Sequence, residues 1–504
     1  MSAASASATL RTARGAEVGW GLPSWLVAFC ASVFVGAAAG LGPLVACAGL
    51  AVVCFGIVVL FRPLIGACTL AAVVPAVAGI RRGLPVPGFR LAEIAIVGVA
   101  ALILLSRRRG EPVRWVAFDW LALAYAAATA LLGAADLLQR GAPFSSSNVG
   151  TLIGPLQFFL LYRAVRTGVT TSSGRAWGLR LILLASIPVS ALALAQEVGV
   201  PGVRPWLEHS TTTDSPGAFA HYLAEGLGRA TGPFDHPHTL GAFLLIVILI
   251  CVGLLLDDRQ AVLPRWGLLA VLAVALCGQA STFTATPVLA TVAGSVALGV
   301  WFRSLGKVVY WISIGAAIVA LVFGPSLARR AHQQYQQTPT VLAANSNPLV
   351  PQTLAYRYSI WKNQYVPVMS GHWLTGYGPD VPAALPGTVP WKFSENLYIS
   401  LVLRGGVPLL LIFAGLMSAL FVTARRKAGS VEPEVRVVSR VVAILVVLLV
   451  GMHLIEPYFI GVGMTHLFWA LCGLMLARTS AGTSGSRDDG ALRSGAPSSA
   501  PTSA

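Results

Sequence analysis

One polar segment of the chain, residues 228–241, combines an arginine with two histidines directly before a long apolar run. Arg229 offers a planar fork of donors that fits phosphate oxygens and stays charged at any working pH. Pro237 suits the first turn of a helix, and a helix N-terminus adds partial positive charge for an anion. We therefore expect Arg229, His236 and His238 to face an anionic ligand. The alternative is that Arg229 reaches to lipid headgroups and the histidines cap the helix.

A second segment, residues 326–400, is the longest polar stretch between apolar runs. It places Arg357 and Trp361 four residues apart, so on a helix they would share one face. This pair suits a ligand that combines a sugar ring with a phosphate, although a helix lying among lipid headgroups has the same composition. Further along, Gly376-Tyr377-Gly378 predicts a tight turn with aromatic walls.

The end of this segment supplies a carboxylate just before the next apolar run. Glu395 precedes Asn396 and Tyr398 there, and it is a candidate general base. The alternative is an acidic residue that favours the N-terminus of the following helix through the helix dipole.

Apolar runs surround these polar segments and must position them. Of the 504 residues, 56% are hydrophobic and 11% are charged, whereas soluble globular chains carry roughly 25% charged residues. This composition excludes a water-soluble protein and predicts repeated membrane-spanning helices. The apolar runs are 25–40, 44–61, 63–80, 91–106, 120–135, 149–165, 179–195, 239–256, 266–280, 287–302, 308–323, 397–422, 437–454 and 457–477.

Lysine and arginine in the short loops set the expected orientation. With the N-terminus inside, basic loops such as 107–114 fall on the cytoplasmic side and the long polar loop falls outside. Arg81, Arg82 and Arg90 disagree with this pattern, so either the early helix count is wrong or these residues meet an anionic ligand outside. We expect an all-α polytopic transmembrane bundle of about 12 to 14 helices with one long extracytoplasmic loop.

The expected organisation is a cytoplasmic tail over residues 1–19, a transmembrane domain over 20–478 and a disordered cytoplasmic tail over 479–504. The outer loops of the transmembrane domain are expected at about 196–238 and 326–396. The net charge of +16, from 35 Lys and Arg against 19 Asp and Glu, lies in short loops, which favours membrane lipids and not nucleic acid as partners.

Neither a disulfide framework, a metal site nor a cofactor is expected. The seven cysteines lie within apolar runs, and His236 and His238 have no third ligand at a useful spacing.

In this order, the polar segments resemble the O-antigen ligase and O-antigen polymerase superfamily of bacterial membrane glycosyltransferases. The family pattern has an arginine and a His-Pro segment that opens a helix, which looks like residues 228–241. A long outer loop follows, similar to the one that carries Arg357 and Trp361 here. The pattern closes with a segment similar to residues 395–399 and with glycines that match Gly405-Gly406.

The chain departs from this family at two positions. Glu395 stands where the family has a histidine, the presumed base, and a carboxylate can do the same work. Residues 281–287 lack the family's arginine, so one pyrophosphate contact is either absent or supplied by Arg81, Arg82 or Arg90.

The resemblance implies an inverting, metal-independent glycosyltransferase of the bacterial cytoplasmic membrane, acting on its outer face. The donor would be a polyprenyl-diphosphate-linked glycan and the acceptor a glycan or lipid-linked glycan. Arg229 and Arg357 would bind the diphosphate and Glu395 would act as base. The remaining substrate-binding candidates are His236, His238, Trp361, Tyr377, Asn396, Tyr398, Arg81 and Arg82.

Two other functions remain open, a transporter of lipid-linked glycans and a non-catalytic accessory protein of polysaccharide export. A transporter would favour inverted half-repeats with interrupted helices, and the sequence shows no convincing internal repeat. The sequence distinguishes neither polymerase from ligase nor the identity of the sugar.

Overall fold

A computed structural model describes residues 43–80, 91–106, 115–211, 229–259, 262–335, 350–379 and 394–478. Within these ranges the chain is helical and contains no β-strand. The chain forms two compact units, Met1–Arg62 and Pro63–Ala504. The described part of the first unit is the apolar helix α3, Pro43–Phe61.

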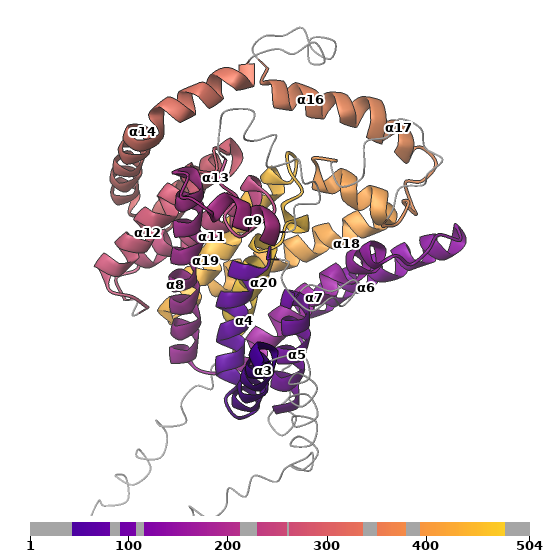
Figure 1. The fold of residues 1–504 in the computed structure, drawn as a ribbon, viewed down its shortest axis with the longest axis horizontal. Coiled ribbons are helices and arrows are strands. Elements are labelled where there is room, and N and C mark those ends of the chain that lie inside the picture. Colours follow the sequence, from indigo (N-terminus) through magenta and orange to yellow (C-terminus); the bar gives the residue numbers. More distant parts are fainter. Residues whose placement is uncertain are drawn as a thin grey trace, which may run out of the picture. The chain divides into compact units, whose positions relative to one another are not determined.

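The second unit is built from helices that differ widely in length (Figure 1). They are α4 (Pro63–Val77), α5 (Leu91–Ser106), α6 (Ala117–Gln139), α7 (Ser146–Gly168), α8 (Ser172–Glu197), α9 (Val203–Ser210), α11 (Pro237–Leu256), α12 (Arg265–Ala280), α13 (Ala285–Trp301), α14 (Leu305–Tyr335), α16 (Gln352–Ile360), a π-helical turn (Trp361–Tyr365), α17 (Val366–Met369), α18 (Leu397–Lys427), α19 (Pro433–Met452), a 3₁₀ turn (Tyr458–Ile460) and α20 (Met464–Leu476).

Six of the described helices, namely α6, α8, α11, α14, α18 and α19, are long and apolar enough to cross a membrane. Six shorter apolar helices accompany them. The protein is therefore an all-α polytopic helix bundle, which confirms the predicted fold class. The predicted run 25–40, both predicted tails, and Arg81, Arg82 and Arg90 lie outside the described residues.

Helix α11 forms the centre of the second unit. Its residues are apolar around the whole circumference, from Leu240 to Leu254, and nearly all of them are buried. It packs against α12, α13, α19 and α20. A helix that is apolar all round is stable only inside a bundle, so the hydropathy of this segment predicts its central position.

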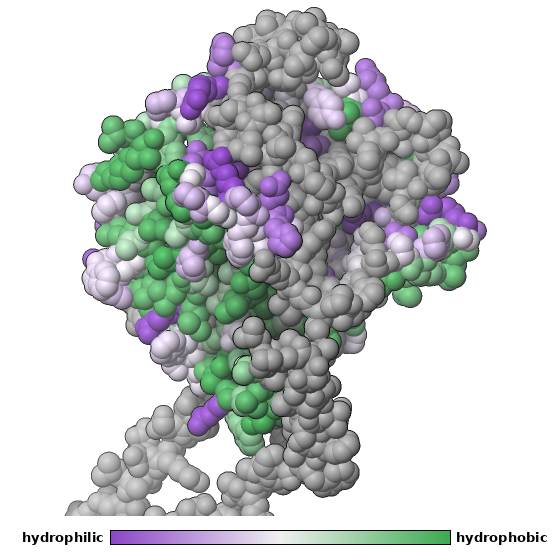
Figure 2. Space-filling model, viewed as in Figure 1, coloured by the Kyte–Doolittle hydropathy of each residue, from purple (hydrophilic) through white to green (hydrophobic). Residues whose placement is uncertain are grey.

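Apolar side chains also cover the outside of the bundle. Helix α14 is apolar but mostly exposed, with Leu321 at 85% exposure. Figure 2 shows a broad apolar surface on the side where α8 and α12 lie. Such a surface is costly in water and suits a hydrocarbon environment.

The bundle has two ends with different chemistry. The site end, as we name it, carries the N-termini of α11 and α18, the α12–α13 turn (residues 281–284) and the α19–α20 segment (residues 453–463). The opposite end is held by ion pairs between helices. There Arg436 binds Asp257 through Nε and Nη2 at 2.8 and 2.9 Å, and Arg175 pairs with Glu432.

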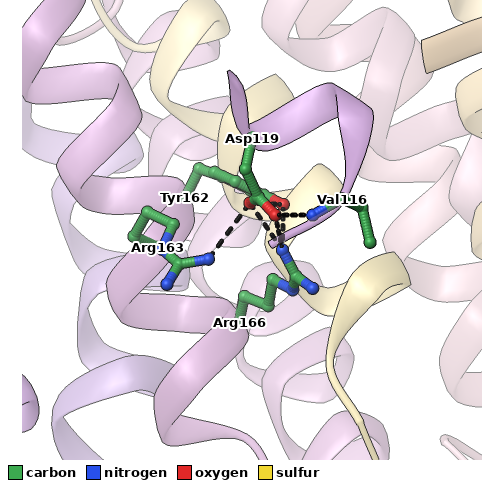
Figure 3. Close-up of polar contacts among 5 residues, drawn as sticks. All are labelled: Val116, Asp119, Tyr162, Arg163 and Arg166. Atoms are coloured by element: carbon green, nitrogen blue, oxygen red, sulfur yellow. Dashed lines mark hydrogen bonds and ion pairs between the residues drawn. The ribbon is translucent and has the colours of Figure 1, made fainter. Parts of the chain in front are cut away.

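A buried polar cluster ties α6 to α7 near the opposite end (Figure 3). Asp119 is fully buried and accepts hydrogen bonds from Tyr162 Oη at 2.7 Å, Arg163 Nη1 at 3.1 Å and the Val116 backbone N–H at 2.6 Å. Arg166 forms an ion pair with the same carboxylate. Because two arginines and Tyr162 share the Asp119 carboxylate, its buried negative charge is compensated within the cluster.

Candidate active site

The turn before α18 places Glu395 and Asn396 at the site end. Asn396 caps the helix, since its side-chain oxygen accepts from Ile399 N at 3.1 Å, and its Nδ2 donates to Leu454 O at 3.1 Å. The backbone of the turn is also bound to the α19–α20 segment, where Leu397 N donates to His453 O at 3.0 Å. Asn396 therefore holds the turn in place. This structural role was not predicted from the sequence, and the contact of Asn396 with a substrate stays a prediction.

Glu395 adopts a left-handed backbone conformation, with φ at +56°. A residue with a Cβ atom is strained there by roughly 1 to 2 kcal/mol, so surrounding contacts must impose this geometry. One of these contacts is to Arg357, whose Nε donates to Glu395 Oε2 at 2.6 Å. The strained turn thus delivers the carboxylate to the guanidinium.

Helix α16 and the π-helical turn that continues it present Arg357 and Trp361 on one face, as their four-residue spacing predicts. While Arg357 binds Glu395, Trp361 Nε1 donates to Ser394 O at 2.7 Å. Both side chains therefore lie against the same turn. Trp361 also begins the π-helical turn, an irregularity that often marks a functional region.

A second carboxylate, Glu456, shares the same guanidinium. Arg357 Nη2 lies 3.4 Å from Glu456 Oε2, and the Glu456 side chain is 21% exposed. Burial raises the pKa of Glu456, and the negative charge of Glu395 raises it further. Sequence reasoning missed this residue, although a single ionisable side chain between two apolar runs is itself a functional signal.

Arg229 approaches this cluster from the segment before α11. It is buried, and its Nε donates to Thr282 O at 3.2 Å, while Ala230 N donates to Ser281 O at 3.0 Å. The charge of Arg229 reaches Glu456, whose pKa it lowers against the larger effect of burial. The α12–α13 turn, which lacks the family's arginine, therefore holds Arg229 through backbone carbonyls.

His236 caps α11 and lies within range of both arginines. Its Nδ1 accepts from His238 N at 3.2 Å, and the two imidazole rings stack with centroids 4.7 Å apart. Burial lowers the pKa of His236 to about 3, and the charges of Arg229 and Arg357 lower it further. His236 is therefore neutral, and the capping role given above as the alternative is confirmed for it.

The predicted site residues Tyr377 and Tyr398 lie outside this network of contacts. Tyr377 is buried, with its Oη donating to Val368 O at 2.7 Å. Tyr398 Oη donates to Val450 O at 2.6 Å, on α19. Tyr377 packs the α16–α17 segment onto α18, and Tyr398 attaches α18 to α19.

Tyr377 belongs to a glycine turn that fits into a break in α18. Gly405 and Gly406 have non-helical backbone angles, and Gly406 has a φ of +67°. Backbone bonds cross the break, from Tyr377 N to Leu403 O at 2.6 Å and from Val407 N to Trp373 O at 2.7 Å. A Cβ atom on Gly406 would lie 2.3 Å from Leu374 O, so only glycine fits. The break and the turn thus fix the α16–α17 segment above α18.

The fold and the site define a polytopic membrane protein with an arginine and carboxylate centre at one end of its bundle. Residues 268–414 match the family model described as O-Antigen ligase, which confirms the resemblance to the O-antigen ligase superfamily. Among curated proteins, none matches the chain. The matched range contains Arg357, Trp361 and Glu395, whereas Arg229, His236 and Glu456 lie outside it. The match supports a membrane protein of glycan ligation or polymerisation.

Proposed function

We propose that the protein transfers a glycan from a polyprenyl-diphosphate carrier to a glycan or lipid-linked acceptor at the outer face of the bacterial cytoplasmic membrane. The observation that carries this proposal is the contact between Arg357 and Glu395, with Arg229 close enough to influence the same groups. It joins an anion-binding side chain to a candidate base within one small site, and the family match supports the substrate class.

The chemistry follows from these roles. The acceptor hydroxyl oxygen bonds to the anomeric carbon of the donor sugar from the face opposite the diphosphate, which inverts that carbon. The bond from this carbon to the diphosphate oxygen breaks, and its electron pair leaves with the polyprenyl diphosphate. Arg229 and Arg357 stabilise the developing negative charge, and Glu395 receives the hydroxyl proton. Since permanent cations stabilise the leaving group, we propose that no metal ion takes part.

Arg357 retains donors for a diphosphate while it holds the carboxylates. Its contacts to Glu395 and Glu456 use Nε and Nη2, and Nη1 has no hydrogen-bond partner among the described residues. The side chain is 12% exposed, so a ligand can reach it. A guanidinium can bind two anions at once through different edges, which suits a residue that connects donor and base.

The test is a transfer assay with purified protein and a lipid-diphosphate glycan. Arg357→Ala and Glu395→Gln should each lose transfer, the second by about 10²- to 10⁴-fold because the base is removed. Both variants should still insert in the membrane. Arg329→Ala is the matched control, since Arg329 lies exposed at the end of α14 and binds only Ser326 among the hydrogen bonds described for it. It should keep wild-type transfer.

Two results would overturn the proposal. Wild-type transfer by Glu395→Gln would exclude this residue as base. Movement of the lipid-linked glycan across a vesicle membrane without release of polyprenyl diphosphate would show a transporter instead.

A further inference from the structure

Glu456 has no role in the transfer chemistry described above, yet it lies at the centre of the charged groups. Its carboxylate shares the Arg357 guanidinium with the Glu395 carboxylate. Two ionised carboxylates held by one guanidinium repel each other, which favours a proton on one of them. The geometry therefore favours one proton on the pair.

The groups that face Glu456 come from each element around it. Arg357 faces it from α16, Glu395 from the turn before α18, and Arg229 from the segment before α11, where His236 lies within range of both arginines. Its own segment contributes His453 and Tyr458. Burial lowers the pKa of His453 to about 3 and raises that of Tyr458, so both are neutral near pH 7, as is His236. Among the described residues, the charge of the site near neutral pH is thus set by two arginines and the two carboxyl groups.

The protonation of one carboxyl group decides the sign of this charge. With both carboxylates ionised, the two arginines are fully neutralised. With one proton on the pair, a net positive charge remains. A donor diphosphate esterified at both ends carries one negative charge on each phosphate, so it is bound far better by the second state.

We propose that Glu456 holds this proton and that the donor diphosphate binds to the form of the site in which Glu456 is neutral. The proposal rests on the proposed function, because it takes the diphosphate to be the ligand of Arg229 and Arg357. It also explains why Glu395 remains available as a base. The proton stays on its neighbour, so the state that binds the donor is the state in which Glu395 can accept a proton.

The consequence is a donor affinity that falls as pH rises. Raising the pH removes the proton from Glu456, cancels the net positive charge and weakens binding, at most by about tenfold per pH unit. Glu456→Gln cannot ionise but keeps the size and one donor of the neutral acid. Its affinity should equal the low-pH affinity of the wild type and should stay constant with pH.

The experiment measures the dissociation constant of farnesyl-diphosphate-linked N-acetylglucosamine from purified protein in detergent between pH 6 and pH 9. Both phosphates of this probe are esterified, so its own charge stays constant over this range. Glu434→Gln is the matched control, since Glu434 is a buried glutamate in the first turn of α19, at the opposite end of the helix that leads to Glu456. This control should keep the pH dependence of the wild type.

The possible outcomes are separable. A wild-type affinity that is constant with pH, or a Glu456→Gln variant that keeps the wild-type pH dependence, would overturn the inference and leave the proposed function standing. Failure of the wild type to bind the probe at any pH would instead count against the proposed function.

A second measurement needs only the wild type and serves if the variant fails to fold. Infrared difference spectra should show the carbonyl band of a protonated carboxylic acid that disappears as the pH is raised. The absence of such a band at low pH would overturn the inference.

Discussion

Asp119 offers a direct measure of how strongly the buried ion cluster stabilises the bundle. The carboxylate is fully buried and is shared by Arg163, Arg166 and Tyr162 (Figure 3). Asp119→Asn keeps the shape of the side chain but removes the negative charge, so both arginines lose their counter-ion. Removing one partner of a buried ion pair costs about 3 to 5 kcal/mol, since a charge is left uncompensated. The folding equilibrium constant should therefore fall by about two to nearly four orders of magnitude.

The assay is reversible unfolding in mixed detergent micelles, followed by tryptophan fluorescence. Asp258→Asn is the matched control, because Asp258 pairs with Arg265 at the surface, where the side chains are 67% and 69% exposed. An exposed pair of this kind contributes less than about 1 kcal/mol. A loss below about 1 kcal/mol for Asp119→Asn, equal to that of the control, would refute the view that this cluster is a compensated buried charge.

Three further predictions concern the site end. Gly406→Ala should lower the melting temperature strongly, because its Cβ atom would lie 2.3 Å from Leu374 O. The control Gly415→Ala, whose Cβ atom would have no neighbour nearer than 3.9 Å, should not lower it. Equal melting temperatures for the two variants would contradict the tight fit at the break. His236→Asn keeps a capping side chain but cannot titrate. The pKa of His236 in the folded protein is lowered to about 3, so the stability that the neutral imidazole contributes is complete above about pH 6.5. This stability is lost as the pH falls, by about 1.4 kcal/mol per pH unit. The wild type should therefore lose more stability than the variant between pH 7 and pH 5. Trp361→Phe removes the indole N–H that donates to Ser394 O at 2.7 Å, in the turn before α18. Transfer should fall while membrane insertion stays normal. Unchanged transfer would show that this bond does not position Glu395.

The helices can be predicted from hydropathy because few backbone conformations are possible for a chain inside a membrane. Uninterrupted apolar runs such as α3 and α11 can satisfy their backbone only as helices, so the sequence predicts them directly. Helical spacing alone places Arg357 and Trp361 on one face, whereas the contact of this face with the turn before α18 does not follow from the spacing.

Pairings between distant segments could not be predicted in this way. Asp119 binds residues 43 to 47 positions further along, and nothing in the spacing of apolar residues specifies that contact. Glu456 is a single acidic residue between two apolar runs and belongs to no pattern, so only its neighbours in space reveal its partner. Tyr377 was predicted to bind substrate from its place in a glycine turn, but the same turn is equally suited to packing, and the structure places its side chain in the core. Its contact with a ligand stays a prediction.

The break in α18 also bears on the biosynthesis of the protein. After the break, Val407–Lys427 is long enough to cross the hydrocarbon core alone, which takes about 20 residues, whereas the part from Leu397 to Arg404 is too short. The short part accepts a backbone bond at Leu403 O from Tyr377 N, and Val407 N, just after the break, donates to Trp373 O. Residues 373 and 377 leave the ribosome before the short part does. The segment with residues 373 and 377 is therefore synthesised first, and the short part of α18 can form its backbone bonds to this segment as soon as it leaves the ribosome.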